Sequence, residues 1–192
     1  MGSEPLTLAF DTSAAHCAAA LLSGDRTIAL HAEEMARGQA ERLMPLLQEL
    51  LTEGGARWQD LARIGVGIGP GNFTGIRISV AAARGLALSL DIPAIGVSTL
   101  AVIRLGAERG TPCVPAPRAQ GYVQRPGQTP ELVAMADVDQ PVLPPIALTL
   151  AERIGWIAAT APADAGLPAP LYVRPADAAP ARDVPPVILD DA

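Results

Sequence analysis

The chain has 192 residues, which is long enough to bury a hydrophobic core in one large domain or two small lobes. Hydrophobic residues make up 49% of it and argue against disorder, but aromatic residues make up only 3%, so Ala, Leu, Val and Ile must build the core. The net charge of −6 disfavours direct binding of nucleic acid, because phosphate contacts require clustered positive charge.

The basic residues are fourteen arginines and no lysine, which excludes a P-loop lysine, a Schiff-base lysine and a serine–lysine dyad. Cys17 and Cys113 are far apart in the sequence, and we expect both to be buried, reduced thiols. The N-terminus does not resemble a signal peptide, and the most apolar window, residues 79–90, is too short to cross a bilayer and contains Arg84. We therefore expect a cytoplasmic protein with no membrane partner.

The first part of the chain predicts three strands, over residues 6–10, 17–22 and 26–31, joined by short turns as an antiparallel meander. A helix follows, in which Pro45 either lies near the start, at about Met44, or causes a kink. Gly54 and Gly55 end this helix. Its apolar residues recur at helical spacing: Leu43, Leu46, Leu47, Leu50 and Leu51.

The middle of the chain predicts a strand over residues 64–68, a glycine–proline loop over residues 69–73 and a long helix over residues 74–90. A short strand over residues 94–97 comes next, and Ser98 or Thr99 caps a helix over residues 100–109. Strands that alternate with helices after a meander indicate an α/β fold whose mixed sheet has a parallel part.

The composition changes after Thr111, where fifteen of the nineteen prolines occur. Only weak strands are predicted there, around Val114 and over residues 121–124 and 132–136, followed by a clear helix over residues 146–159 and a short terminal strand or extended segment over residues 171–174. We therefore divide the chain into a first lobe over residues 1–110, a shortened, proline-rich second lobe over residues 111–176 and a flexible tail over residues 177–192.

The glycine–proline loop nearly matches two phosphate-binding motifs. A GxGxxG motif would need glycine at Asn72, and a P-loop would need Lys-Ser/Thr after Gly75, where Ile76 and Arg77 stand. The alternative is a tight connection between strand and helix that holds no ligand, with Asn72 or Thr74 as the helix cap. The physics of the loop alone leaves both interpretations open.

The long helix carries small or apolar residues over most of its surface, which is typical of a helix buried on more than one side. One side should face its own sheet, and the other should meet either the leucine-rich helix or a partner subunit. Arg77 and Arg84 lie seven residues apart and share a face. The candidate partner interface consists of Ser79, Ala82, Ala83 and Arg84.

Asp11 follows the first strand and would lie at the sheet edge, where α/β sites form. Such a carboxylate can hold magnesium, but a strand-end Asp more often caps its own turn, and no second acid or histidine is placed to join it. A GxSxG elbow, a metal-ligand cluster and a supported cysteine–histidine pair are all missing from the sequence. These observations predict no catalytic, cofactor or metal site and favour a non-catalytic role.

The loop and the start of the long helix resemble the GPGSFTGLRIG signature of the bacterial tRNA threonylcarbamoyladenosine biosynthesis protein TsaB (YeaZ) family. Weaker matches follow in the family's order, over residues 8–13, 85–88, 95–100 and 170–175. The signature residues are Gly69, Pro70, Gly71, Asn72, Phe73, Thr74, Gly75, Ile76, Arg77 and Ile78.

The resemblance implies an actin-like (ASKHA, ribonuclease-H-related) fold: a mixed sheet with flanking helices in two lobes, the second reduced. It also implies a non-catalytic subunit that acts with a TsaD-like catalytic subunit and a TsaE-like ATPase. Together they transfer a threonylcarbamoyl group to the adenosine next to the tRNA anticodon, and this subunit meets tRNA only through the complex. The alternative from another class is a stand-alone, Mg-ATP-dependent phosphotransferase that uses Asp11.

One segment departs from the family. Residues 116–123 stand where the family has Asp-Ala-Arg…Glu-Val-Tyr, and both acids are gone. The residues leave three questions open: whether the chain pairs with itself or with another protein, whether a nucleotide binds at such an interface, and whether the shortened second lobe is functional.

Overall fold

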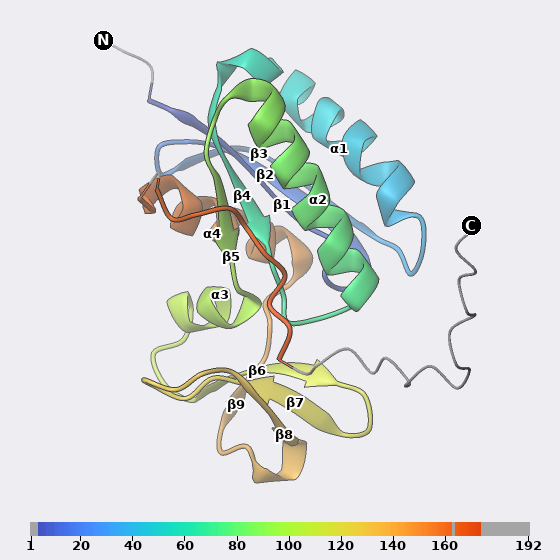
Figure 1. Cartoon of the computed structure of the whole chain (residues 1–192), viewed down its shortest axis with the longest axis vertical. Helices are drawn as coiled ribbons and strands as arrows, with labels where there is room; N and C mark the ends of the chain where they lie inside the picture. Colours follow the sequence, from blue (N-terminus) through green and yellow to red (C-terminus); the bar gives the residue numbers. More distant parts are fainter. Residues whose placement is uncertain (1–3, 163, 174–192) are drawn as a thin grey trace, which may run out of the picture.

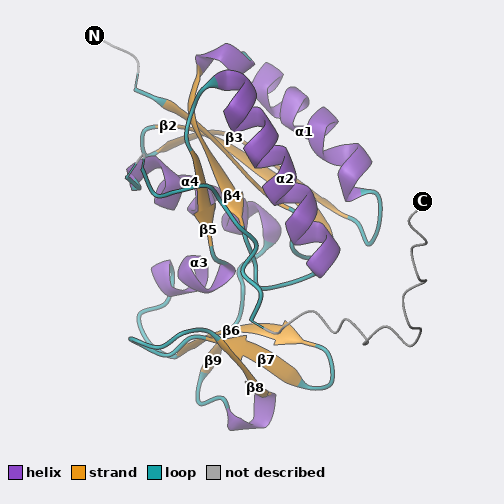
Figure 2. Ribbon diagram, viewed as in Figure 1, coloured by secondary structure: helices purple, strands orange, loops and turns teal. Residues whose placement is uncertain are grey.

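The computed structural model describes residues 4–162 and 164–173 and contains two β-sheets of different size (Figure 1). The larger sheet carries helices on both faces, and the smaller sheet lies beyond one end of it with a short helix between them (Figure 2). The expected tail, residues 177–192, lies outside the described residues.

The larger sheet has five strands in the order β3-β2-β1-β4-β5. Its first three strands form the predicted antiparallel meander, and β1 pairs with β4 and β4 with β5 in parallel. Because β1 and β4 run parallel, their carboxyl ends meet at the same sheet edge. The strands are β1 (Leu6–Asp11), β2 (His16–Ser23), β3 (Arg26–Glu34), β4 (Leu61–Gly67) and β5 (Ala94–Val97).

Alternating side chains along β1 divide the core between the two faces of this sheet. Leu8 and Phe10 pack on the face covered by α1 (Gln39–Glu53) and α2 (Phe73–Leu90). Ala9 belongs to the opposite face, where alanines of β1 and β2 allow α4 (Ala147–Thr160) to approach closely. Both faces are therefore buried, which explains why the strands read as continuous apolar runs.

The smaller sheet has the strand order β8-β7-β6-β9, and α3 (Thr99–Leu105) packs against it through Leu100 and Ile103. Its core is thin, because only a few buried apolar residues of the sheet meet α3. The strands are β6 (Thr111–Ala116), β7 (Gln120–Val123), β8 (Glu131–Ala134) and β9 (Pro141–Val142), and two 3₁₀ turns lie at Trp58–Asp60 and Met135–Asp137.

One element differs from the predictions, and two others decide between alternatives that the sequence left open. The helix α1 begins at Gln39 and runs through Pro45, since the buried leucines on its inner face hold it against the sheet on both sides of the proline. The helix α3 ends at Leu105 rather than at Arg109, with Gly106 as its C-cap. Residues 171–173 form no strand, although the Leu171 N–H donates to the Ile68 carbonyl.

The helix α4 also lies outside the lobe to which the sequence assigned it. It packs against β1, β2 and β4 of the larger sheet, so the chain leaves the first lobe after β5 and returns to it after β9. The boundary at residue 111 therefore separates the two sheets but places α4 on the wrong side. Local pattern could predict this helix but not the sheet against which it buries its apolar face.

The helix α2 has the length and composition of a membrane span, with a mean hydropathy of 1.2 over 18 residues. A core helix of a folded domain passes the same test. Six of its residues are buried against the larger sheet and α1: Gly75, Ile76, Ser79, Val80, Ala83 and Ala87.

Candidate functional site

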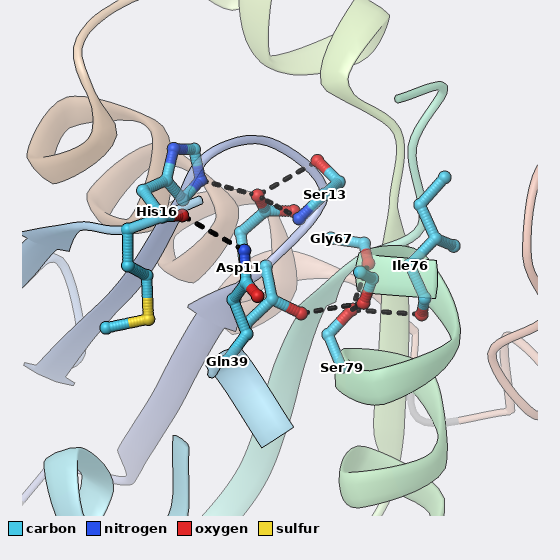
Figure 3. A network of polar contacts seen from close by, with 10 residues as sticks. Asp11, Ser13, His16, Gln39, Gly67, Ile76 and Ser79 are labelled. Carbon is cyan, nitrogen blue, oxygen red and sulfur yellow. Dashed lines mark hydrogen bonds and ion pairs between the residues drawn. The ribbon is translucent and has the colours of Figure 1, made fainter. Parts of the chain in front are cut away.

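Asp11 lies at the carboxyl end of β1 and is completely buried. Its Oδ1 accepts hydrogen bonds from the backbone N–H and the hydroxyl of Ser13, both at 2.9 Å, and lies 2.8 Å from Nε2 of His16 (Figure 3). The side chain thus closes the turn between β1 and β2, as the commoner interpretation of a strand-end Asp predicts. The expectation that no histidine joins Asp11 is wrong, because the strand β2 brings His16 back beside it.

The second oxygen of this carboxylate, Oδ2, is buried and has no hydrogen-bond partner among the described residues. It lies against Gly67 at the end of β4, where a Cβ would stand only 1.8 Å from Oδ2. Within residues 4–162 and 164–173, no three His, Cys, Asp or Glu side chains gather in a way that could hold a metal ion. The geometry around Asp11 therefore offers a single carboxylate oxygen enclosed by the protein's own backbone.

The glycine–proline loop packs against the turn that Asp11 closes. A Cβ at Gly71 would lie 2.3 Å from the Ser13 carbonyl oxygen, and a Cβ at Gly75 would lie 1.9 Å from the Thr12 carbonyl oxygen. Two hydrogen bonds join the segments: the Thr12 hydroxyl donates to the Gly75 carbonyl at 2.7 Å, and the Asn72 N–H donates to the Ser13 carbonyl at 2.6 Å. The glycines therefore permit close contact between two loops of the same chain, which favours the connection without a ligand.

The amides at the start of α2 are also used within the chain. Asn72 is the N-cap, and its Oδ1 accepts a hydrogen bond from the Gly75 N–H at 2.8 Å. The Ile76 N–H donates to the Asn72 carbonyl as the first bond of the helix. The Asn72 side chain therefore accepts a backbone hydrogen bond of the kind that a bound phosphate accepts in a P-loop.

Two of the four candidate interface residues face the core instead. Ser79 is fully buried, and its hydroxyl lies 3.1 Å from both the Gly67 and Ile76 carbonyl oxygens (Figure 3). Ala83 is fully buried against the larger sheet, and Ala82 is partly buried at the edge of the same cluster. Only Arg84 is exposed, so most of the predicted interface set faces the core of this chain rather than solvent.

We call the exposed side of this helix the α2 outer face. Leu88 is 86% exposed, and a Cβ at Gly85 would meet no atom within 4 Å. A glycine inside a helix costs up to about 1 kcal/mol relative to alanine, and no contact within residues 4–162 and 164–173 requires one at position 85. The face consists of Thr74, Arg77, Ala81, Arg84, Gly85 and Leu88, all exposed.

An aromatic cluster at the start of α2 was not predicted. The guanidinium of Arg77 lies 3.8 Å from the centre of the Phe73 ring, its Nε donates to the Tyr172 hydroxyl at 2.8 Å, and the two rings lie 5.0 Å apart. These contacts join the C-terminal segment to α2. All three residues belong to segments that match the family, Phe73 and Arg77 to the signature and Tyr172 to a weaker segment. Their contact could not be predicted, because Tyr172 lies far from the other two in the sequence.

The segment that departs from the family forms the hairpin between β6 and β7. Arg118 and Ala119 occupy its turn with positive φ angles of 62° and 52°. Tyr122 packs beside α3. The segment that departs from the family therefore forms the end of β6, a turn and β7 of the smaller sheet.

Both cysteines are buried thiols, as expected. Burial raises the pKa of Cys17 to about 11, with a further contribution from the negative charge of Glu33, and burial also raises the pKa of Cys113. Thiols with raised pKa values remain protonated at neutral pH and are poor nucleophiles.

Comparison with known proteins identifies the family. The family model described as "TsaD: tRNA N6-adenosine threonylcarbamoyltransferase" matches residues 29–124, which are 96 of the 192 residues and therefore half of the chain. The chain belongs to this family. The matched region contains the whole signature loop and the α2 helix.

Relatives of the chain include TsaB proteins. The tRNA threonylcarbamoyladenosine biosynthesis protein TsaB of Escherichia coli (strain K12) is 42% identical over 102 residues, which are 53% of this chain and 44% of the relative. TsaB of Bacillus subtilis (strain 168) is 43% identical over 93 residues, which are 48% of this chain and 41% of the relative. The matched segment thus spans less than half the length of either relative.

A solved structure extends the likeness over most of the chain. YeaZ from Pseudomonas aeruginosa superposes with a TM-score of 0.66 and 28% identity, covering 87% of this chain and 100% of that one. The resemblance to the TsaB (YeaZ) family and the mixed α/β fold class expected from it are both confirmed.

Proposed function

We propose that this chain is a non-catalytic partner subunit of the assembly that transfers a threonylcarbamoyl group to the adenosine next to the anticodon of tRNAs. It acts in the cytoplasm with a TsaD-like catalytic subunit and a TsaE-like ATPase, and it meets tRNA only through the complex. Family membership and the TsaB relatives support this role.

One observation carries the non-catalytic part of the proposal. The sheet edge at Asp11, where a catalytic relative of this fold class would place its ligand, is filled by the chain's own signature loop. Gly71 and Gly75 lie against the turn backbone, and no solvent reaches the carboxylate. The signature loop therefore closes the first lobe around Asp11. The first lobe would then contribute a binding surface for a partner rather than a catalytic site.

That surface is the α2 outer face, which replaces the interface suggested by the sequence. Arg84 is retained from that set, and Arg77, Ala81, Gly85 and Leu88 join it. Small residues at positions 81 and 85 allow a partner helix to come close.

Co-expression with the TsaD-like protein of the same source tests the proposal. We expect the two chains to co-purify and, with the TsaE-like ATPase, to form threonylcarbamoyladenosine in tRNA, measured by mass spectrometry of digested tRNA. Ala81→Trp should abolish co-purification because it places an indole on the outer face, while Arg26→Gln on the exposed end of β3 serves as the control. Failure of the unmodified chain to bind the TsaD-like protein would contradict the proposal.

The alternative, a stand-alone phosphotransferase, makes the opposite prediction. Calorimetry of the isolated chain with Mg-ATP should show tight binding that Asp11→Ala removes. The closed contact of the signature loop with the Asp11 turn speaks against this outcome.

A further inference from the structure

A groove of about 490 Å³ lies beside the last turns of α4, the helix that covers the face of the larger sheet opposite to α2 (Figure 1). It is lined by Trp156, Ala159 and Thr160 of α4 and by Gly24 and Asp25 of the turn between β2 and β3. Trp156 is 36% exposed, so part of its indole is open to a ligand. The groove is therefore separate from both the signature loop and α2.

Two glycines bring the walls of the groove together. A Cβ at Gly155 would overlap the Leu22 side chain, so glycine lets α4 pack closely on β2 and places the next residue, Trp156, beside the turn. Gly24 occupies this turn with a φ angle of 59°. A Cβ at Gly24 would overlap the Glu4 carboxylate, which therefore lies directly against the turn. The N-terminal segment thus adds a second carboxylate at the edge of the groove.

The carboxylates at the groove have no cation of their own among the described residues. The six ion pairs within residues 4–162 and 164–173 include neither Glu4 nor Asp25. Arg26 follows Asp25 in the sequence, but it belongs to none of these pairs and does not line the groove. An open aromatic ring therefore lies next to negative charge that these residues leave uncompensated.

The ring, the carboxylate and the hydroxyl in the groove favour the same kind of ligand. The face of an indole attracts cations, and a carboxylate accepts charge-assisted hydrogen bonds from N–H donors. The Thr160 hydroxyl donates to the Trp156 carbonyl at 3.2 Å, which leaves its oxygen as an acceptor. Gly24 and Ala159 add a small, apolar lining along which an alkyl chain can lie.

We infer that this groove binds a primary alkylammonium group, with the charge between the Trp156 ring and the Asp25 carboxylate and the alkyl chain along Ala159. An anion would meet the carboxylates, and a neutral apolar ligand would gain nothing from them, so charge selects the ammonium. Free polyamines and the lysine side chains of other proteins both carry this group. The inference does not depend on the proposed function, because it involves neither α2 nor the TsaD-like protein.

Two-dimensional proton–nitrogen NMR of the full chain tests the inference, because the chain has only two tryptophans and Trp58→Phe assigns their indole N–H signals. Pentylammonium chloride should shift the Trp156 indole and Thr160 amide signals saturably, in the millimolar range. The Trp58 indole donates to Gln48 and packs on the α1 side of the sheet, so its signal should not move. The neutral analogue n-pentanol should bind about tenfold more weakly.

Three variants separate the contributions of the carboxylate and the ring. Asp25→Asn keeps the shape of the side chain and should weaken pentylammonium binding about fivefold. Glu41→Gln is the matched control, because it removes the same charge from an exposed residue of α1, and it should leave the Kd within about twofold. Trp156→Leu keeps an apolar side chain without the ring and should weaken binding about fivefold, measured from the Thr160 amide.

Equal binding of pentylammonium and n-pentanol would overturn the inference, because charge would then play no part. An equal loss in Asp25→Asn and Glu41→Gln would also overturn it, since both variants would then report only the net charge of the chain. Spermidine and Nα-acetyl-lysinamide distinguish the two sources of the group. Tighter binding of one supports a free polyamine or a protein side chain as the occupant, and binding of neither rejects the alkylammonium site.

Discussion

Asp11 holds the turn after β1 with one carboxylate oxygen and presses the other against Gly67. The sequence suggested that this residue caps its own turn, and the structure adds the reason that glycine stands at the end of the neighbouring strand. A residue with any side chain at position 67 would occupy the space of Oδ2. The two positions are therefore coupled although 56 residues separate them in the sequence.

Because the two side chains compete for the same space, substitutions at positions 11 and 67 should have non-additive effects on the free energy of unfolding. Gly67→Ala should lower the free energy of unfolding by about 2 kcal/mol or more, because its Cβ overlaps Asp11. Asp11→Ala should lower it by a similar amount through the lost hydrogen bonds to Ser13 and His16. In the double variant the overlap is gone, so urea unfolding should show less loss than the sum of the two. Strict additivity would show that the two side chains do not compete for the same space.

Arg42 forms a second local network, with Glu33 and Glu49. Its hydrogen bonds lower the pKa of both carboxyl groups below the ordinary value of 4.5. A lowered folded-state pKa means that the stabilisation is present above about pH 4.5 and is lost as the pH falls through the lower values. The two carboxylates are exposed, so the effect should be small.

Arg42→Gln should therefore reduce the loss of folding stability that occurs as the pH falls below about 4.5. Thermal unfolding measured between about pH 3 and pH 6 should show a smaller decrease in Tm for this variant than for the unmodified chain. Arg57→Gln provides the comparison, because Arg57 also pairs with an acid, Asp60, but on an exposed 3₁₀ turn. Equal slopes for Arg42→Gln and the unmodified chain would assign the acid response to other carboxylates.

The helix α2 shows at the scale of a single element why composition could not assign its faces. Small residues occur on both sides, with Ser79 and Ala83 against the sheet and Ala81 and Gly85 toward solvent. The inner small residues let α2 lie close to β4, as the Ser79 hydrogen bond to Gly67 indicates. Among the residues that the structure describes, the outer ones have no such partner.

Two glycines of this helix should respond to alanine with opposite signs. Gly75→Ala should destabilise the protein by about 2 kcal/mol or more, since its Cβ would lie 1.9 Å from the Thr12 carbonyl oxygen. Gly85→Ala should stabilise the isolated chain by about 0.5–1 kcal/mol, because the site is open and alanine favours helix. Chemical denaturation measures both changes, and a loss of stability in Gly85→Ala would reveal a conformational role for the glycine.

Tryptophan substitutions separate core from surface on the same helix. Ser79→Trp should unfold the isolated chain, because position 79 is fully buried and already hydrogen-bonded. Ala81→Trp should leave the circular dichroism spectrum and the melting temperature nearly unchanged, since position 81 is exposed. If the Ser79→Trp variant folds, position 79 tolerates a large side chain, which would support its original assignment to the partner interface.

The whole molecule consists of a larger first lobe, with α2 on its outside, and a thin second lobe (Figure 1). The second lobe packs against α3 and is joined to the first lobe by the segments before β6 and after β9. The net charge of −6 repels the phosphate backbone of tRNA. We expect the isolated chain to show no tRNA binding in a filter assay even at about 20 mM salt, where phosphate contacts are strongest. Tight binding without a partner would contradict the role proposed here.

The strands of the larger sheet and the helix α2 could be predicted from local sequence, because apolar periodicity acts between near neighbours. Local sequence left Asn72 and Thr74 as alternative caps, and the structure uses Asn72. The signature loop and the order of the weaker matching segments were sufficient to recognise the family. Cys17 and Cys113 could be assigned as buried thiols for the same reason, since they lie within apolar runs.

Only the tertiary structure decided which side of α2 is free, why Gly67, Gly71 and Gly75 must be glycine, and where α4 packs. Each of these depends on contacts between segments that lie far apart in the sequence, and a helix with small residues on two sides satisfies either orientation equally well by composition. The contact of the signature loop with the Asp11 turn selected one orientation, and that contact left Arg77 and Arg84 on the outside.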